Sequence, residues 1–403
     1  MIPFSPPHIK QEAIDEVVDT LKSGWITTGP KTKLFENKLT EYCGNKRTLA
    51  VNSATFGLEA VLRWYGVGLG DEVIIPAYTY TATASTVIHT GATPIMVDVN
   101  ADDFNISAEA IINAITPQTK VIVPVDIAGF PARLDIINEI VKEHSSKVIA
   151  NSENQELLGR ILIMSDAAHS FGASLKGERT GSLTDISIFS FHAVKNMTTA
   201  EGGAIALNLP QPFDNDEIYK ELNTLSLHGQ SKDALAKTKK GAWKYDIIDA
   251  AYKGNMTDIQ ASLGLIALKY YEIDNLPTRK AIVEKYNKAF ISTNWAQIPI
   301  IKDENRESSY HLYTLRIKDI TEEQRDKIIQ YIFDKDVSVN VHFQPLPLFS
   351  AYKNRGYNIN DFPIAYDNYS REISLPVYQD LSDENVNIII NAVIKSVEEV
   401  LND

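Results

Sequence analysis

Two residues with complementary chemistry follow consecutive apolar strands predicted in this sequence. Asp166 comes after a strand predicted at residues 160–164, and Lys195 follows one at 185–190. A deprotonated lysine amine can form a Schiff base with an aldehyde, and a carboxylate can hold a protonated ring nitrogen. An aspartate and a lysine about thirty residues apart in consecutive strand-end loops are what a pyridoxal phosphate site requires. Taken singly, Asp166 is equally well explained as a helix cap or loop residue, and Lys195 as a solvent-facing lysine.

A third group of residues can bind an anion. Ser53, Ala54 and Thr55 follow a strand predicted at residues 47–51 and open a predicted helix that ends near residue 65. Free backbone N–H groups and two hydroxyls would converge there, which suits a phosphate. Considered alone, the tripeptide is better explained as an ordinary helix cap.

A parallel sheet would bring these residues together. Short apolar strands alternate with amphipathic helices from residue 47 to residue 143, and further strands are predicted at 160–164, 185–190 and 203–208. The alternation predicts an α/β fold with a mainly parallel, doubly wound sheet. Ligands of such sheets bind at the carboxyl edge of the strands. Thr257 and Gln260 then predict a capping box at the start of a long helix.

A smaller α+β unit is predicted after this sheet. Its strands are expected at residues 310–317 and 337–342, and its helices at 322–333 and 383–401. We therefore expect a large cofactor-binding domain over residues 1–250 and a small C-terminal α+β domain over 251–403.

Composition limits the partners and the location. The chain has 403 residues, of which 44% are hydrophobic and 23% charged, enough to bury a large core. A net charge of −13 disfavours nucleic acid and anionic membrane as partners. We find no signal peptide or membrane-spanning stretch, so the cytoplasm is the expected location, and no metal site is predicted. Neither a Walker motif nor Gly-x-Gly-x-x-Gly after the first strand is present, which disfavours a plain nucleotide binder.

The motifs around these residues resemble those of the DegT/StrS family of sugar aminotransferases, which are fold-type I pyridoxal phosphate enzymes. The matching stretches span nearly the whole chain and lie at residues 23–30, 52–55, 70–76, 91–94, 166–169, 190–203 and 252–260. Within the family, the motifs are most similar to those of the aminotransferases that form UDP-4-amino-4-deoxy-L-arabinose. The resemblance implies transfer of an amino group from glutamate to a keto nucleotide-sugar, with a 4-keto sugar favoured over a 3-keto sugar. Surface polysaccharide or amino-sugar biosynthesis is the implied setting.

The resemblance also implies roles for individual residues. Lys195 would bind pyridoxal 5′-phosphate covalently as an internal aldimine, and Asp166 would hold the pyridinium nitrogen. The other implied cofactor-binding residues are Ala54, Thr55 and Ser190 at the phosphate, His169 near the phenolic oxygen, Tyr80 on the pyridine ring, and Lys253 and Asn255 from a neighbouring subunit. A homodimer with shared active sites follows from the last two. Tyr80 is otherwise a core tyrosine, and Lys253 and Asn255 are otherwise part of an exposed helix lead-in.

Two other functions stay open. A related sugar dehydratase is disfavoured because those family members carry histidine in place of the lysine. A pyridoxal phosphate-binding regulatory protein without turnover is compatible with the same motifs. The sequence also departs from the family at Asp126 and Pro347, where relatives commonly have histidine, and we expect both changes to alter the sugar pocket. Ser165 replaces a usual glutamate and should point away from the ring, because neighbouring strand residues face opposite sides.

Overall fold

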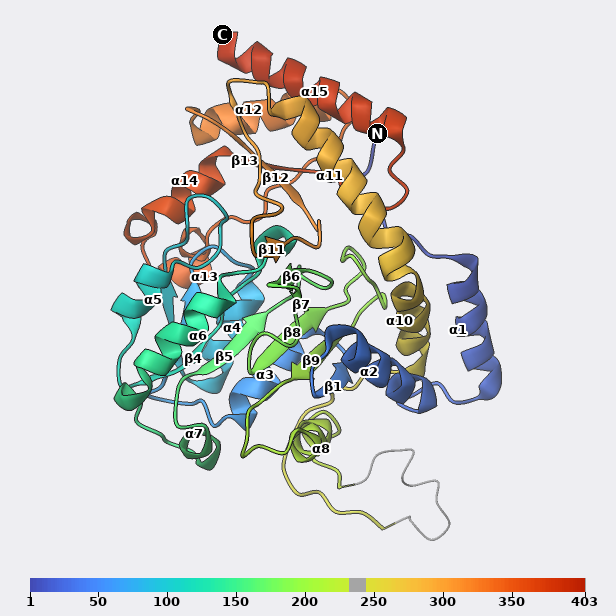
Figure 1. Ribbon diagram of the computed structural model, residues 1–403, viewed down its shortest axis with the longest axis vertical. Helices are drawn as coiled ribbons and strands as arrows, with labels where there is room; N and C mark the ends of the chain where they lie inside the picture. The colour runs from blue at the N-terminus through green and yellow to red at the C-terminus, as the bar shows by residue number, and fades with distance from the viewer. Residues whose placement is uncertain (232–243, 403) are drawn as a thin grey trace.

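The computed structural model describes residues 1–231 and 244–402, with a large sheet at the centre and a smaller helical and strand unit at one end (Figure 1). Seven strands form the central sheet in the order β1-β9-β8-β5-β4-β2-β3. They are β1 (Arg47–Val51), β2 (Glu72–Pro76), β3 (Thr93–Val97), β4 (Thr119–Ile122), β5 (Leu162–Asp166), β8 (Ile186–Ser190) and β9 (Gly203–Leu207). β9 runs antiparallel to β1 and β8, and the other neighbours pair in parallel. The predicted α/β fold with a mainly parallel sheet is confirmed.

The part of the chain that carries this sheet also contains helices. They are α1 (Gln11–Ser23), α2 (Pro30–Cys43), α3 (Ala54–Trp64), α4 (Thr81–Thr90), α5 (Ala108–Ala114), α6 (Leu134–Glu143), α7 (Glu153–Leu158), α8 (Asn215–Leu225) and α10 (Asp258–Tyr270). α10 packs against α1 and α2. The predicted capping box is confirmed, since Thr257 and Gln260 bond reciprocally at the start of α10. A π-helical turn, Tyr271–Asn275, then leads into α11 (Leu276–Phe290).

The C-terminal part has its own sheet and hydrophobic cluster. β10 (Ala296–Gln297), β12 (Tyr313–Ile317) and β13 (Glu372–Leu375) form a three-stranded sheet. Its helices are α11, α12 (Glu322–Phe333), α13 (Ser350–Lys353), α14 (Pro363–Arg371) and α15 (Asp383–Asn402), and a short sheet of β11 (Arg306–Glu307), β6 (Ser174–Leu175) and β7 (Glu178–Arg179) lies nearby. Apart from Ile2, this cluster draws its apolar side chains from residues 276–400. The division into domains at residue 250 stays a prediction.

One strand of this unit differs from the sequence prediction. Residues 337–342 form single bridges, from Val337 to Ile2 and from Asn340 to Ser374, and not a continuous strand. β13, which was not predicted, takes the place beside β12. Its four residues, Glu-Ile-Ser-Leu, do alternate polar and apolar side chains, but the strand is short and its glutamate and serine are buried together with the apolar residues.

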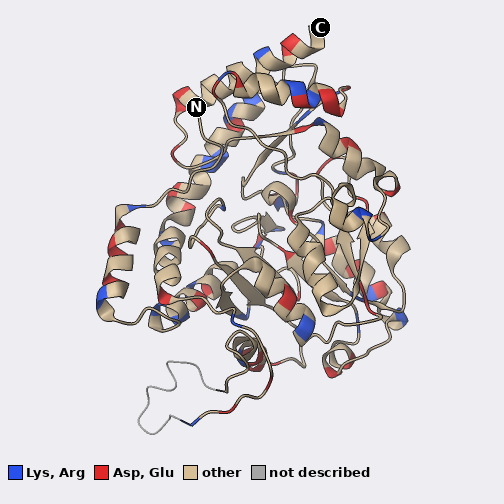
Figure 2. Cartoon of the chain, turned by 180° about the vertical axis from the view of Figure 1, so that it is seen from behind, with Lys and Arg blue, Asp and Glu red and all other residues tan. Residues whose placement is uncertain are grey.

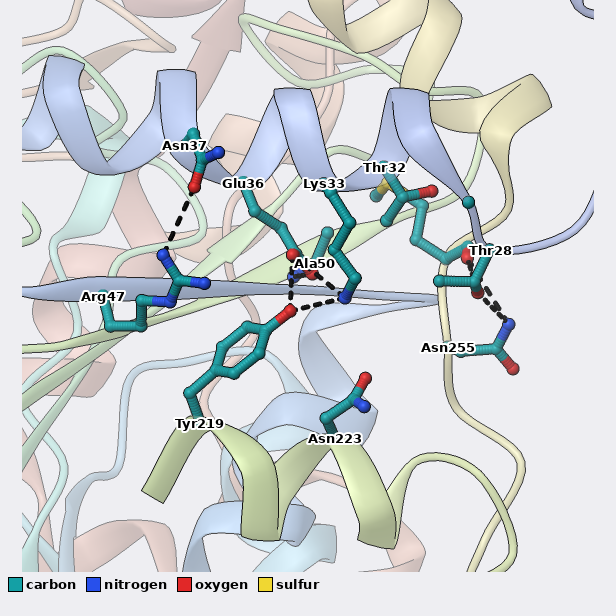
Figure 3. Close-up of polar contacts among 12 residues, drawn as sticks. Thr28, Thr32, Lys33, Glu36, Asn37, Arg47, Ala50, Tyr219, Asn223 and Asn255 are labelled. Atoms are coloured by element: carbon teal, nitrogen blue, oxygen red, sulfur yellow. Dashed lines mark hydrogen bonds and ion pairs between the residues drawn. The ribbon is translucent and has the colours of Figure 1, made fainter. Parts of the chain in front are cut away.

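A buried carboxylate fixes the edge strand β1 (Figure 3). Glu36 of α2 accepts hydrogen bonds from the Ala50 N–H at 3.1 Å and from Tyr219 Oη of α8 at 2.7 Å. Lys33 Nζ lies 3.2 Å from the same carboxylate. Burial raises the pKa of Glu36, and these contacts oppose that rise. The network ties α2, β1 and α8 together just before the chain reaches Ser53.

Acidic and basic residues are interspersed along the chain, as seen from behind in Figure 2. Among the described residues, no helix combines the length and the apolar character that a membrane span needs.

Candidate active site

The carboxyl edge of the sheet opens into a cavity of about 390 Å³. Seven of the nine predicted site residues line it, namely Ala54, Thr55, Tyr80, Asp166, His169, Ser190 and Lys195. Lys253 and Asn255 do not line it. The other lining residues are Phe4, Ser5, Ser53, Leu58, Thr79, Ala82, Val125, Ala168, His192, Val194, Glu201, Gly202, His311, Leu312, His342 and Phe343.

Asp166 is the last residue of β5 and is buried. Thr83 Oγ1 donates a hydrogen bond to its Oδ2 at 2.9 Å, and the Ala168 N–H donates to Oδ1 at 3.3 Å. Burial raises the pKa of Asp166, while the two hydrogen bonds and the charge of Lys195 oppose this rise. A cation placed in the cavity would therefore stabilise the ionised carboxylate.

Lys195 faces the same cavity from the turn that follows β8. Its backbone N–H bonds to the His192 carbonyl at 2.9 Å, which closes the turn. Burial lowers the pKa of the amine to about 8, against the opposing charge of Asp166. A substantial fraction of the amine is thus neutral near neutral pH, as a nucleophile requires.

The start of α3 forms the anion site and also a helix cap. Ser53 Oγ accepts a hydrogen bond from the Phe56 N–H at 3.1 Å, so Ser53 is the N-cap. Gly203 of β9 allows close packing here, because a side chain on it would come within 2.6 Å of the Ala54 nitrogen. Gly203 also pairs with Ser190, which brings that hydroxyl to the same end of the sheet. N–H groups of the first helical turn have no partner within the helix and can bind a phosphate.

His169 supplies an unsatisfied polar atom. Its side chain is buried, and its Nδ1 has no hydrogen-bond partner among the described residues. The ring packs against His311 and Phe343, with centroid distances of 4.4 and 5.6 Å. Burial, Lys195 and His342 lower the pKa of His169, so the imidazole is neutral. A polar ligand atom in the cavity would complete this site, which is the behaviour expected of a residue beside a cofactor oxygen.

Tyr80 lies at the rim of the cavity and is not a core tyrosine. It precedes α4, its side chain is 60% exposed, and its ring lies 6.0 Å from that of Phe343. A flat ligand in the cavity could cover the exposed ring.

Lys253 and Asn255 belong to a segment that lies beside the edge strand β1. The Asn52 N–H bonds to the Gly254 carbonyl at 2.7 Å. Asn255 Nδ2 donates to Thr28 Oγ1 at 2.6 Å (Figure 3), and Thr28 Oγ1 in turn donates to the Met256 carbonyl. The segment is thus held in place outside the cavity of its own chain.

The structure places Asp126, one of the two departures from the family pattern, outside the cavity. Its carboxylate does not line the cavity but is fully buried, where it accepts hydrogen bonds from Ser170 Oγ at 2.6 Å and from the Ala132 N–H at 2.8 Å. Burial raises its pKa to about 6. Ser165 Oγ lies 3.5 Å from the same carboxylate, on the side away from Asp166, as the strand alternation predicted. Pro347 is also buried and does not line the cavity.

Several cavity residues were not found from the sequence. Phe4 comes from the N-terminal segment, and His311, His342 and Phe343 come from the C-terminal part. Thr83 of α4 does not line the cavity but contacts Asp166 from behind this lining. Among these residues, only His342 could have been suspected from the sequence, because it lies shortly before Pro347, where relatives commonly have histidine. Within the described ranges, no group of three histidine, cysteine or acidic residues could hold a metal ion.

Known proteins resemble the chain over its whole length. A putative sugar aminotransferase, Spr1654 from Streptococcus pneumoniae, has been solved in a PMP form that is 48% identical, with a TM-score of 0.96, over 99% of this chain and 100% of that one. Its PLP form is 46% identical with a TM-score of 0.95, over 99% of each chain.

Two further relatives also match this chain over nearly its whole length. The uncharacterized protein MJ1066 of Methanocaldococcus jannaschii is 40% identical over 99% of this chain and 98% of its own length. The spore coat polysaccharide biosynthesis protein SpsC of Bacillus subtilis is 36% identical over 97% of this chain and 96% of its own. Residues 7–394 match the DegT/DnrJ/EryC1/StrS aminotransferase family. The chain therefore belongs to the DegT/DnrJ/EryC1/StrS aminotransferase family.

Proposed function

We propose that this protein is a pyridoxal phosphate-dependent aminotransferase that moves an amino group from glutamate to a keto nucleotide-sugar, with a 4-keto sugar as the preferred acceptor. The observation that carries the proposal is the meeting of Lys195, Asp166 and the start of α3 at one cavity. The PLP and PMP forms of the similar Spr1654 support the cofactor. The name of SpsC supports a role in polysaccharide biosynthesis. We place this activity in the cytoplasm.

Each residue then has a physical task. Ser190, Thr55 and the N–H groups of α3 would hold the phosphate, and the Lys195 amine would hold the aldehyde carbon. Asp166 would hold the protonated ring nitrogen, and His169 would bond the phenolic oxygen. The bound cofactor supplies an electron sink for the carbon that loses its proton. Once displaced by the substrate amine, Lys195 could move that proton, because its lowered pKa makes its neutral form more abundant than that of a lysine in water.

A panel of keto nucleotide-sugars tests the acceptor. The protein is first converted with glutamate to its pyridoxamine form, and each sugar is then added while the absorption of the pyridoxal form is followed. We expect rapid return of that absorption with a 4-keto nucleotide-sugar and a slower return with a 3-keto one. Return with 2-oxo acids other than 2-oxoglutarate, and with none of the keto sugars, would contradict the sugar assignment.

The first half of that experiment separates the alternatives. A regulatory protein without turnover would bind the cofactor but would not be bleached by glutamate. A dehydratase is disfavoured by Lys195, because it retains the amine that the dehydratases of the family replace with histidine.

We further propose a homodimer in which Lys253 and Asn255 of one subunit bind the cofactor phosphate of the other. The position of both residues outside the cavity of their own chain supports a role across a two-fold axis. A Lys195→Ala homodimer, and a homodimer altered at both Lys253 and Asn255, should each have little activity.

Mixed dimers of these two variants test the sharing. If subunits exchange at random, about half of the dimers are mixed, and each mixed dimer has one intact site and one doubly altered site, so activity should return to about one quarter of wild type. Mass spectrometry confirms the exchange. Exchange without recovered activity would show that each site belongs to a single subunit.

A further inference from the structure

A carboxyl, a hydroxyl and an imidazole form one hydrogen-bonded chain in the wall of the cavity. Glu372 and Ser374 belong to β13 and are both fully buried. Ser374 Oγ donates to Glu372 Oε1 at 2.5 Å, and His342 Nδ1 lies 2.9 Å from Ser374 Oγ. His342 lines the cavity, so the chain leads from the protein interior to the place where a substrate would bind.

The structure holds His342 from several sides. Its backbone N–H donates to Glu372 Oε2 at 3.0 Å, and its carbonyl accepts from Tyr78 Oη at 2.7 Å. Phe4 stacks on the imidazole with a centroid distance of 5.5 Å and an interplanar angle of 21°. No hydrogen bond joins Nε2 to any residue in the described part of the chain. Nε2 is therefore the nitrogen left for a ligand.

The hydrogen bonds that join Glu372, Ser374 and His342 can be arranged in two ways. When Glu372 is ionised, the Ser374 hydroxyl donates to it, Nδ1 carries the imidazole proton, and Nε2 is an acceptor. When Glu372 is protonated, it donates to Ser374, the hydroxyl donates to Nδ1, and Nε2 carries the proton and becomes a donor. The two arrangements differ by one proton, and that proton enters or leaves at Nε2.

We propose that Glu372 and Ser374 are positioning residues of a proton relay, through which His342 Nε2 protonates the keto oxygen of the sugar. This inference rests on the proposed function. During transamination the ketone oxygen leaves as water and gains two protons, while the amino group being transferred loses two. The relay delivers one proton as the C–O bond breaks, by moving the Glu372 proton to Ser374 and the Ser374 proton to Nδ1. It takes one back from the nitrogen through Nε2, so no other reactant is needed.

Burial and the surrounding charges together favour a protonated Glu372 and a neutral His342, as the relay requires. Burial raises the pKa of Glu372 to about 8, against the opposing effects of Ser374, the His342 N–H, Arg325 and Arg316. Burial and Lys195 lower the pKa of His342 to about 4, so its ring stays neutral. The remaining titratable groups near the relay are His169, His311 and the phenol of Tyr78, which stay uncharged because burial lowers the pKa of both histidines and raises that of the phenol. Below about pH 8 the carboxyl holds the proton of the relay, and above it this proton is lost.

The tautomer of His342 can be measured without turnover. Histidine labelled with ¹⁵N, in cofactor-loaded protein, should show His342 with its proton on Nε2 at pH 6.5 and on Nδ1 at pH 9.5. His342→Gln identifies the signals. In Glu372→Gln the amide oxygen is needed to accept from the His342 backbone N–H, so the amide NH2 faces Ser374 and donates to it, and the Nε2–H form should persist at both values of pH. A His342 signal that changes with pH in the same way in Glu372→Gln would overturn the relay.

Kinetics give a second test. Ser374→Ala should slow the sugar half-reaction by roughly 10²- to 10⁴-fold, with little change in the sugar concentration at half saturation. Thr314→Val is the matched control, because Thr314 pairs with Ser374 across the sheet and its buried hydroxyl has no partner among the described residues. The control should retain the wild-type rate, and Ser374→Thr should restore most of it. Equal rates in Ser374→Ala and Thr314→Val would also overturn the proposal.

The pH profile distinguishes the relay from Lys195. The relay loses its donor proton as pH rises through about 8, so it makes the sugar half-reaction slower on the alkaline side. Lys195 acts in the opposite direction, because its neutral amine becomes more abundant as pH rises. Glu372→Gln should remove the alkaline decline. If wild-type protein accepts no keto nucleotide-sugar, the proposed function fails, while the tautomer measurement still decides whether the relay exists.

Discussion

Lys195→Ala protein is expected to lose transamination activity by roughly 10²- to 10⁴-fold or more, because the amine both attaches the aldehyde and moves a proton. Its position in the cavity and its lowered pKa support both tasks. The cofactor should still bind through its phosphate and ring, without a covalent link. Borohydride reduction followed by mass spectrometry of the peptide around residue 195 measures that link, and stopped-flow absorption measures the rate.

Two further measurements make this result specific. Val194→Ala is a suitable control, because Val194 also lines the cavity but carries no amine, and it should remain within a few-fold of wild type. Added small primary amines should partly restore proton transfer in Lys195→Ala. A reducible link that persists in Lys195→Ala, or turnover at the wild-type rate, would move the covalent role to another residue.

Asp166→Asn is expected to slow transamination by about 100-fold or more, since a fixed negative charge is lost where the ring nitrogen develops its positive charge. The substitution conserves shape, and an asparagine oxygen can still accept the hydrogen bond from Thr83. Without the cofactor, burial already disfavours the ionised carboxylate, so the variant should melt at the same temperature as wild type or higher. Unaltered turnover would remove Asp166 from the site.

Thr83→Val is the matched control for Asp166→Asn, because it changes the same site without removing the charge of the carboxylate. It removes one hydrogen bond to Asp166 and leaves the carboxylate in place. Because that bond lowers the pKa of Asp166, its loss should raise the pKa and move the acidic side of the pH–rate profile to higher pH. At pH values above this acidic decline, the rate of Thr83→Val should fall much less than the rate of Asp166→Asn. A shift toward lower pH would contradict the role of the hydrogen bond.

Local patterns in the sequence were sufficient to predict the central sheet and to bring Asp166 and Lys195 to one cavity, where we propose that the cofactor binds. Asp166 and Lys195 could be placed together because β5 and β8 are parallel neighbours, and parallel strands end at the same edge. The Ser53 tripeptide had two interpretations, and both agree with the structure, since the residue that caps α3 also lines the cavity. The Asp126 carboxylate hydrogen-bonds to Ser170 and does not line the cavity, so its expected effect on the sugar pocket stays a prediction.

The surroundings of Asp166, and the cavity wall that faces the sheet edge, depend on contacts between distant parts of the chain. Thr83 reaches Asp166 across 83 positions, and His342 and Phe4 meet although more than 300 residues separate them. Hydrophobic periodicity reports which face of an element is buried, not which other element covers it.

Neighbouring residues in the sequence were enough to predict the succession of strands along the chain, the capping box of α10 and the chemistry of the sheet edge. Only the folded structure showed which side chains face Asp166 and Lys195, and how Glu372, Ser374 and His342 come together. Glu372 and Ser374 are polar, so the sequence alone did not indicate that they are buried, and their hydrogen bonds exist only once β13 packs beside β12 and the His342 segment.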